Sequence, residues 1–442
     1  MYNSFLLLLI AFVKPQPAST FIPTLTSRRA PPFSYTNTRN LKASEGFDDI
    51  AFSGDQVLGG AASNDVLPTD VDFDSSIFYT STPPHPPSTY ISTLSSPSAL
   101  NSAIQTLLSL HNITLPLSSI NSLIIIGAVG VLKTNDKGDE KWYQQCLPIM
   151  CDTGEKIRVH YPVRRFPNFK DLKIVHSDNS FIVVDKPPML PSQPFKGNRW
   201  ESVVGYLECS GTVPTTFQEV TKILSTSNRP SLLNRLDLPV SGMIFLGTSI
   251  RSRSTFSKLS KEGKIKKQYQ CVSYNKVKTG VKRLLLYTKD ERGGGGMGCS
   301  KGQVLCSSDL RLLKQKDSGW TKCIMDVNSR TSFTRGERIV YEYTINLVTG
   351  RKHQIRSCMS YLGGSLVGDC LYEPMEGLGV RVGMEEEEVE GLERGLERGR
   401  TVRGRIGLRC VAVSVDGKVY RAKEPDLEKG EEPEKWWRHE LA

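Results

Sequence analysis

The sequence predicts an α+β fold, in which short strands and one helical segment share a core. Asp178-Asn179 is a good hairpin turn between two short apolar strands. An uninterrupted apolar run that Gly247 ends suits a buried strand. The expected elements are strands at 172–176, 181–185 and 243–246, a helix at 250–264, and strands at 265–274, 339–348 and 406–415.

Length and charge limit the possible organisation. The chain has 442 residues, enough for two or three domains. Hydrophobic residues make up only 38%, so part of the length is expected to be tail, linker or insertion. The net charge is +11, from 57 Lys and Arg against 46 Asp and Glu, which favours a polyanionic partner, nucleic acid before a membrane. Organellar proteins are often basic, so charge alone does not decide.

The ten cysteines are scattered and form no Cys-x-x-Cys pair. No two histidines have metal-ligand spacing, so we expect free thiols in a reducing compartment, no metal site and no cofactor. No apolar run is long enough to span a bilayer, so no membrane partner is expected. A monomer is the default expectation.

The first residues have the character of a targeting segment. The apolar run 5–13 has the length of a signal-peptide core. Ala18-Ser19-Thr20-Phe21 resembles the Ala-x-Ala-Phe junction of two-part plastid presequences in algae with secondary plastids. This resemblance implies a presequence over 1–44 and a plastid location. A mitochondrial presequence and an ordinary secretory signal are the alternatives.

Two segments follow before the main domain. Residues 45–98 are rich in Ser, Thr, Pro and Asp and are expected to be mostly linker. Residues 99–164 combine apolar positions at helical spacing, glycine-broken apolar sequence and an alternating strand at 154–163. This small α/β module resembles a degenerate S4-like RNA-binding module. The alternative is an extra layer packed on the main domain.

The stretch 233–247 places Arg235 and Asp237 in a polar turn before the buried strand. A carboxylate at the mouth of a buried strand sits in a strong field, because little water screens it. Arg235 would help to keep Asp237 ionised. Taken alone, an Arg two residues from an Asp is usually a surface pair or a turn device.

Four ordered motifs resemble those of the RluA family of RNA pseudouridine synthases. Asn-Arg-Leu-Asp-x-x-Val-Ser-Gly, at 234–242, is similar to the family's His-Arg-Leu-Asp-x-x-Thr-Ser-Gly. The other motifs are Asp-Lys-Pro within 183–194, Lys-Gln-Tyr at 267–269, and Gly-Arg-Lys-His-Gln-Ile-Arg at 350–356, which a Gly-Asp-x-x-Tyr motif follows at 368–372. Four motifs in the family's order rarely arise by chance.

The resemblance implies a domain organisation and an activity. It implies a pseudouridine synthase fold with a mixed, largely antiparallel sheet over 165–425. Insertions are expected near 290–317 and 376–400, and a charged tail over 426–442. The implied reaction isomerises specific uridines of ribosomal or transfer RNA to pseudouridine, without metal or cofactor.

The resemblance also assigns roles to single residues. It implies that Asp237 is the catalytic carboxylate, that Arg356 pairs with it and that Tyr269 stacks on the target base. Arg235 is expected near RNA phosphate or in the gap left by the flipped base. Leu408 is expected to line the uracil pocket.

Several residues depart from the family's pattern next to these positions. Asn234 replaces His, Val240 and Lys352 replace Thr, Met189 replaces Gly, and Gln193 replaces His. They put substrate choice and turn geometry in question more than the chemistry.

Two other functions compete. One is a catalytically silent RNA-binding protein on the same fold. The other is a carboxylate-based hydrolase such as a glycosidase, which would need a second acid facing Asp237.

Overall fold

The computed structural model describes residues 73–79, 88–134, 138–226, 229–279, 281–289, 305–308, 311, 320–335, 338–369, 371–372 and 405–422. All of them belong to one compact unit, 40–442. The expected presequence 1–44, the insertion at 376–400 and the tail at 426–442 lie outside the described residues. Within these residues, no helix is both long and apolar enough to cross a membrane.

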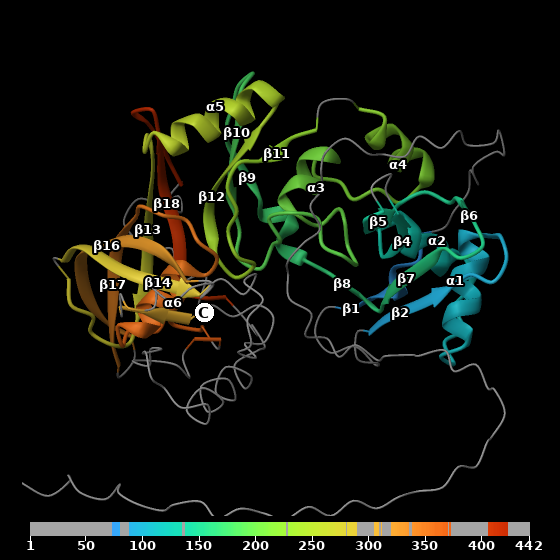
Figure 1. Ribbon diagram of the computed structural model, residues 1–442, viewed down its shortest axis with the longest axis horizontal. Coiled ribbons are helices and arrows are strands. Elements are labelled where there is room, and N and C mark those ends of the chain that lie inside the picture. The colour runs from blue at the N-terminus through green and yellow to red at the C-terminus, as the bar shows by residue number, and fades with distance from the viewer. Residues whose placement is uncertain are drawn as a thin grey trace, which may run out of the picture. The chain divides into compact units, whose positions relative to one another are not determined.

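The small module pairs two helices with a four-stranded sheet (Figure 1). Helices α1 (Leu100–Ser109) and α2 (Leu117–Ile125) bury their apolar faces, including Leu100, Ile104 and Leu107, as the helical spacing predicts. The sheet has the order β2-β7-β4-β5 and is antiparallel throughout. Its strands are β2 (Ser88–Thr93), β4 (Val129–Thr134), β5 (Glu140–Gln145) and β7 (Lys156–Tyr161).

The module begins earlier than the sequence indicates. Strand β2 lies inside the range expected to be linker, and it pairs with β7 along its whole length. Four further short strands and a 3-10 turn accompany the module, and residues 73–79 and 88–98 are therefore structured rather than linker. These elements are η1 (Ser75–Ile77), β1 (Phe78–Tyr79), β3 (Ser98–Ala99), β6 (Met150–Cys151) and β8 (Val163–Arg164). Polar composition hid β2, because neither of its faces is fully buried.

The main domain is built on an eleven-stranded sheet with the order β15-β14-β16-β17-β13-β18-β12-β10-β9 (Figure 1). Strand β11 pairs with β12, and β19 pairs with β18. Every pairing is antiparallel except β12 with β18, so the sheet is mixed and largely antiparallel, as predicted. The strands are β9 (Lys173–Ser177), β10 (Phe181–Lys186), β11 (Ser231–Leu232), β12 (Ser241–Gly247), β13 (Ile265–Ser273), β14 (Val281–Lys289), β15 (Leu305–Ser307), β16 (Trp320–Arg335), β17 (Arg338–Leu347), β18 (Leu408–Val415) and β19 (Lys418–Arg421).

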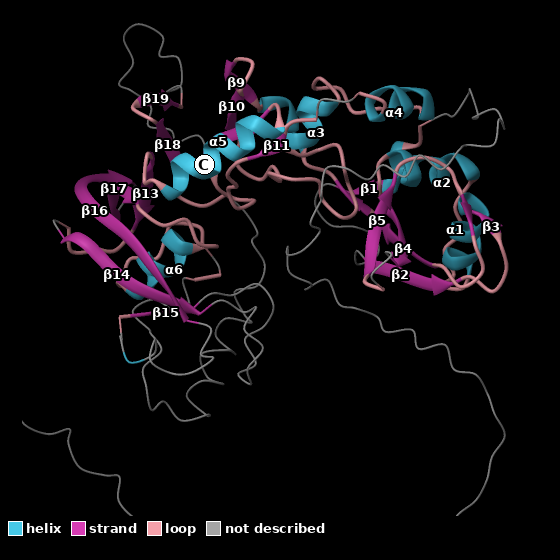
Figure 2. Cartoon of the chain, turned by 45° about the horizontal axis from the view of Figure 1, so that its top comes forward, coloured by secondary structure: helices cyan, strands magenta, loops and turns pink. Residues whose placement is uncertain are grey.

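Four α-helices and one 3-10 helix accompany this sheet in the described residues (Figure 2). They are η2 (Pro167–Asp171), α3 (Val203–Glu208), α4 (Phe217–Leu224), α5 (Ile250–Lys261) and α6 (Gln354–Tyr361). Both views show α6 beside β14. Capping boxes at Thr216 and Ser249 fix where α4 and α5 begin.

Direct hydrogen bonds join the small module to the loop at 195–201. The Trp200 indole N–H donates to the Ile125 carbonyl at the end of α2, at 2.7 Å. The Gln144 amide donates to the Phe195 carbonyl at 2.9 Å. Trp200 is fully buried, so this contact is a packed interface.

Candidate active site

The only parallel strand pair described in the sheet lies under the candidate site. In it Ser241 of β12 lies opposite Arg409 of β18, and Gly242 lies opposite Cys410. Gly242 has a φ of +110°, and a Cβ at this position would lie 2.2 Å from the Cys410 carbonyl oxygen. Glycine is therefore required here, because any side chain would force the two strands apart. The glycine of the Val-Ser-Gly motif is thus what lets β12 and β18 pair.

Asp237 lies in the loop between β11 and β12, and Asn234 anchors that loop. The Asn234 carboxamide accepts from the Phe245 N–H at 2.7 Å and donates to the Met243 carbonyl at 3.3 Å. The Val240 N–H donates to the Asp237 carbonyl at 3.1 Å and closes the turn. Asn234 therefore anchors the loop to β12 through its side-chain amide, at a position where the family resemblance predicts histidine.

The segment 186–192 supports the same loop from its other side. The buried ammonium of Lys186 donates to the carbonyls of Leu190 at 2.8 Å, Pro187 at 2.9 Å and Leu238 at 3.2 Å. The Met189 N–H also donates to the Leu238 carbonyl, at 2.8 Å. Ser192 Oγ donates to the Leu236 carbonyl at 2.7 Å. The segment 186–192 thus holds the backbone on both sides of Asp237.

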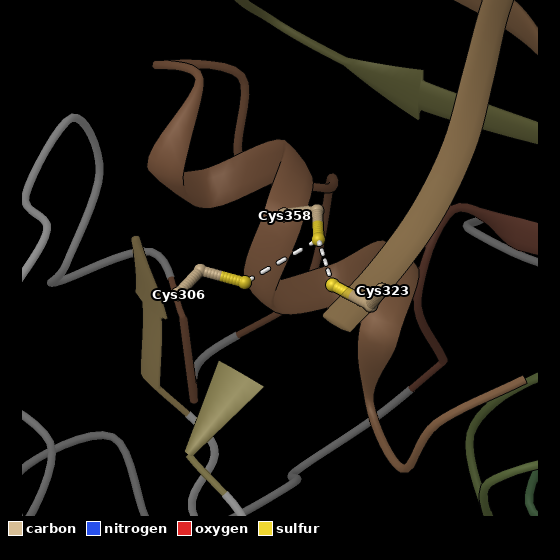
Figure 3. Close-up of side chains that lie close together, drawn as sticks. All are labelled: Cys306, Cys323 and Cys358. Carbon is tan, nitrogen blue, oxygen red and sulfur yellow. Dashed lines mark hydrogen bonds between the residues drawn. The ribbon is translucent and has the colours of Figure 1, made fainter. Parts of the chain in front are cut away.

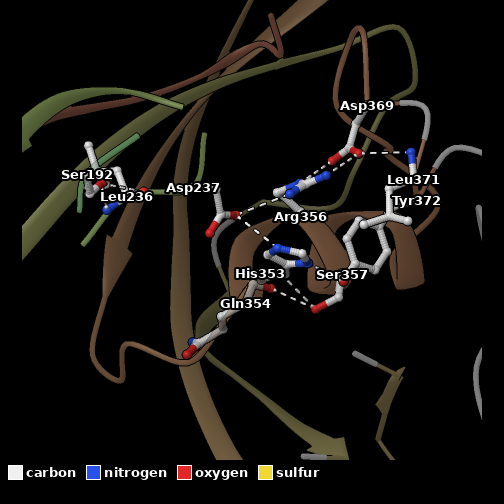
Figure 4. A network of polar contacts seen from close by, with 10 residues as sticks. All are labelled: Ser192, Leu236, Asp237, His353, Gln354, Arg356, Ser357, Asp369, Leu371 and Tyr372. Atoms are coloured by element: carbon white, nitrogen blue, oxygen red, sulfur yellow. Dashed lines mark hydrogen bonds and ion pairs between the residues drawn. The ribbon is translucent and has the colours of Figure 1, made fainter. Parts of the chain in front are cut away.

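Arg356, on α6, meets Asp237 across the site (Figure 4). Its Nη1 donates to Asp237 Oδ2 at 3.2 Å. Its other edge makes two hydrogen bonds with Asp369, from Nε at 2.7 Å and from Nη2 at 2.8 Å. Arg356 and Asp369 are fully buried, whereas the Asp237 side chain is 27% exposed. The arrangement leaves one partly accessible carboxylate beside a guanidinium that a second carboxylate holds in place.

The charges of this pair are mutually stabilised. Burial alone would raise the pKa of Asp237, but nearby His353 and Arg356, with the Arg356 hydrogen bond, lower it below its ordinary value. Burial opposes the charge of Arg356, but Asp369 and then Asp237 raise the pKa of Arg356 above its ordinary value. At neutral pH Asp237 is therefore ionised, as a nucleophile or general base requires.

His353 lies between the pair and Tyr372. Its Nδ1 is 2.9 Å from the Tyr372 hydroxyl, and its Nε2 is 3.7 Å from Asp237 Oδ2. Burial, which outweighs the charge of Asp237, lowers the pKa of His353 to about 4. Because His353 is neutral at pH 7, Arg356 is the cation that is hydrogen-bonded to Asp237 there.

Tyr269 approaches the site from β13. It lies opposite Cys410 of β18, next to a β-bulge, and is 5% exposed. Burial, the Cys410 thiol with its hydrogen bond, and the charge of Asp237 together raise the pKa of Tyr269 well above its ordinary value. Tyr269 therefore presents a neutral phenol within the electrostatic reach of Asp237.

The other two predicted residues have opposite environments. Leu408 is the first residue of β18 and is buried opposite Cys271. Two residues before Cys410, it shares that residue's face of the sheet. Arg235 is exposed at the tip of the loop and has no hydrogen bond or ion pair with a described residue. Leu408 is therefore buried on the face of β18 that carries Cys410, whereas Arg235 lies at the surface.

The sequence motifs contain Asp369 and Lys186, but they assign no role to either residue. The Gly-Asp-x-x-Tyr motif was the available signal, since it supplies both Asp369 and Tyr372. Asp369 is also a second acid in the site, but both of its oxygens are bound to Arg356 and it is only 1% exposed. It does not face Asp237 across an open space, as a glycosidase would require.

Comparison with known proteins agrees with this geometry. Residues 180–361 match the family model of RNA pseudouridylate synthases. The chain is 30% identical over 146 residues to an uncharacterized RNA pseudouridine synthase of Haemophilus influenzae, covering 32% of this chain and 54% of the relative. It is 25% identical over 224 residues to ribosomal large subunit pseudouridine synthase D of Buchnera aphidicola, covering 50% and 61%.

A plant relative and a solved structure are similar too. RNA pseudouridine synthase 6, chloroplastic, of Oryza sativa is 21% identical over 322 residues, covering 65% of this chain and 61% of the relative. The structure of human RNA pseudouridylate synthase domain containing 4 has a TM-score of 0.36 and 16% identity, covering 57% of this chain and 88% of that one. The chain spans between half and two thirds of the length of these curated relatives. Over residues 180–361 the chain is therefore similar to RNA pseudouridylate synthases.

Proposed function

We propose that the protein isomerises uridine to pseudouridine in RNA, with Asp237 as the catalytic carboxylate. The observation that carries this proposal is the contact of 3.2 Å between Arg356 Nη1 and Asp237 Oδ2. It pairs a buried cation with a partly exposed anion, and the sequence motifs of both residues match the family. The reaction breaks the bond between N1 and C1′, turns the uracil and joins its C5 to C1′, so one ionised carboxylate serves as nucleophile or general base.

Tyr269, Leu408 and Arg235 take supporting roles in this proposal. The target base has to leave its stack before its reacting atoms are accessible. Tyr269 would contact it as a neutral ring and hydrogen-bond donor, and Leu408 would pack against its edge. Arg235, exposed and without a described partner, would contact phosphate or fill the gap left by the base.

The substrate class we propose is structured RNA, with large-subunit ribosomal RNA first and transfer RNA second. Two Buchnera aphidicola relatives are named for the ribosomal large subunit. The net charge of +11 supports a polyanionic partner. We further propose that the small module, 88–164, contributes to RNA binding, and that the protein acts as a monomer.

The test is release of tritium from RNA labelled at C5 of uridine. Forming the bond between C5 and C1′ expels the hydrogen at C5, so release reports this reaction. We expect the wild-type protein to release tritium, and Asp237→Asn to lose at least about a thousandfold in rate, because the amide is not a nucleophile or base. Asp171→Asn, an exposed acid on η2, is the matched control and should retain wild-type activity.

RNA binding separates the possible failures. Wild-type protein that binds organellar and transcribed ribosomal RNA but releases no tritium from either would favour a silent RNA-binding protein. Equal release from wild type and Asp237→Asn would remove Asp237 from the catalytic role. Mapping the modified uridine then distinguishes ribosomal from transfer RNA.

We propose a plastid as the place of action. The Oryza sativa and Arabidopsis thaliana relatives named RNA pseudouridine synthase 6 are called chloroplastic. The resemblance of residues 18–21 to a plastid presequence junction supports the same compartment. Imaging a fluorescent fusion of the full chain beside plastid and mitochondrial markers tests this, and co-localisation with the mitochondrial marker would overturn it.

A further inference from the structure

Three cysteines that are distant in the sequence converge beside α6 (Figure 3). Cys306 comes from β15, Cys323 from β16 and Cys358 from α6. Their three sulfur atoms lie within 4.8 Å of one another. In Figure 3 the side chains of Cys306 and Cys323 both point toward Cys358.

The distances between the sulfurs suit a shared metal ion. Cys358 Sγ is 3.3 Å from Cys306 Sγ and 3.8 Å from Cys323 Sγ. With Zn–S bonds of about 2.3 Å, two thiolates of a tetrahedral zinc site lie about 3.8 Å apart. The sulfurs of Cys323 and Cys358 already have that separation. The other two distances need to change by only a few tenths of an ångström to about one ångström to reach it.

Ordinary core packing does not account for this convergence. Cysteine is often buried singly as a small apolar residue. The described chain has five such cysteines, Cys146, Cys151, Cys209, Cys271 and Cys410, all buried and none in a metal-ligand group. No Cys-x-x-Cys motif signals this cluster in the sequence. The three cysteines come together only in the folded chain, through β15, β16 and α6.

We propose that Cys306, Cys323 and Cys358 bind one thiolate-seeking metal ion, Zn²⁺ or Cu⁺. Soft thiolate ligands select these ions. Binding of Zn²⁺ releases three protons and leaves a complex of net charge −1, whose fourth position takes an external ligand. Copper(I) needs no fourth ligand. The Ser357 hydroxyl lies 3.3 Å from Cys306 Sγ and would donate to that thiolate in the loaded site.

The metal would tie the sheet edge to the helix that carries Arg356. Strand β15 has three residues and, among the described strands, pairs only with β14 at the end of the strand order. Cys358 lies two residues after Arg356 on α6. A shared ion would therefore fix α6 against β15 and β16, close to Arg356 but without contacting Arg356, Asp237 or Asp369.

Metal content of the full-length protein tests the proposal directly. Protein purified under reducing conditions from cells supplied with zinc and copper should carry one Zn or Cu per chain by elemental analysis. Replacement with Co²⁺ should give a thiolate-to-cobalt charge-transfer band, and a mercurial reagent should release the native metal as it titrates the thiols. The element found distinguishes zinc from copper.

The variant Cys323→Ser should lose the bound metal, with affinity at least about tenfold weaker, whereas Cys209→Ser, a buried cysteine elsewhere, should keep it. Wild-type protein without zinc or copper, even after both ions are offered to the reduced thiols, would overturn the proposal. So would a disulfide among the three cysteines in fresh protein, or full metal content in folded Cys323→Ser. If Cys323→Ser does not fold, the wild-type metal content and cobalt spectrum decide alone.

Discussion

Asp237 and Arg356, the two partners of the ion pair, are held in place in different ways. On the Asp237 side, Lys186, Met189 and Ser192 bind backbone carbonyls of the loop. On the Arg356 side, one side chain, the carboxylate of Asp369, holds the guanidinium through two charge-assisted hydrogen bonds. Hydrogen bonds to backbone carbonyls tolerate changes in neighbouring side chains. A buried ion pair, in contrast, does not tolerate the loss of either partner.

This contrast accounts for where the chain departs from the family's motifs. Most departures lie on the Asp237 side, at Met189, Gln193, Asn234 and Val240. The loop contacts of Met189 are made by its backbone, and Asn234 still binds β12 through its amide. Asp369 and Arg356 keep the family's residue types. Among the residues that support the pair, we therefore expect substitutions on the Arg356 side to cost more stability than substitutions on the Asp237 side.

Among the groups that hold Asp237 and Arg356 in place, the largest effect on stability is expected from Asp369→Asn. It leaves the buried Arg356 charge with Asp237 as its one carboxylate partner, and breaking such a pair costs about 3–5 kcal/mol of the free energy of unfolding. Because Arg356 is no longer fixed, kcat should fall at least about tenfold while KM for RNA changes little. Urea denaturation and tritium release measure the two quantities, with the exposed Asp171→Asn as control. Stability and kcat equal to those of the control would show that Asp369 does not hold Arg356.

The second effect depends on pH and comes from His353. Its folded pKa is about 4, below its ordinary value of 6.5, because burial disfavours the charged form. Between these values the unfolded chain binds a proton that the folded chain does not. The contribution of neutral His353 to the free energy of unfolding is therefore complete above pH 6.5 and is lost as the pH falls toward 4. The charged groups that act on His353 are Asp237, Arg356, Lys352 and Asp369, and the Tyr372 hydroxyl is hydrogen-bonded to its Nδ1.

From pH 7 to pH 5 this loss should amount to about 2 kcal/mol. His353→Asn removes the titrating ring and keeps a residue that tolerates the left-handed φ of +51° at this position. The variant should therefore lose about 2 kcal/mol less than the wild type between pH 7 and pH 5, by urea denaturation. Buried His160 titrates in both proteins and cancels in the difference. Identical pH dependence in the two proteins would contradict a neutral His353.

A smaller effect is expected from Lys186→Met. The change removes a buried ammonium that serves the carbonyls of Leu190, Pro187 and Leu238. Unsatisfied buried acceptors cost about 1–3 kcal/mol of the free energy of unfolding. The exposed Lys170→Met is the control, and both are compared by urea denaturation. A Lys186→Met protein as stable as Lys170→Met would mean that the loop does not depend on this ammonium.

The local elements of the fold were predictable, because their signals are local. The hairpin at Asp178-Asn179, the buried run of β12 and helix α5 agree with the predicted ranges within a few residues. Strand β2 was not predicted, because its polar residues carry no apolar alternation. The parallel pairing of Ser241 with Arg409 was also out of reach, since it joins residues 168 apart and leaves no local pattern.

The site was predictable only where a motif named its residues. Asp237 and Arg356 were paired in advance, and the structure places them in contact. The supporting roles of Asp369 and Lys186 were not predicted, because each depends on partners that come close only in the folded chain. The cysteine cluster was missed for the same reason, since Cys306 and Cys358 are 52 residues apart.

The smallest effect is expected from Met189→Gly, which tests whether the Asp237 side relies on backbone alone. Met189 has a φ of +60°, a conformation that glycine adopts without strain and other residues rarely adopt. Glycine relieves that strain but adds freedom to the unfolded chain, so the free energy of unfolding should change by less than about 1 kcal/mol. The Met189 N–H still reaches the Leu238 carbonyl, so kcat should stay within about twofold of wild type. Met189→Leu, which keeps the strained backbone, is the matched control in urea denaturation and tritium release. A tenfold loss of kcat in Met189→Gly with unchanged stability would mean that the methionine side chain itself shapes the Asp237 loop, and the contrast between the two sides would fail.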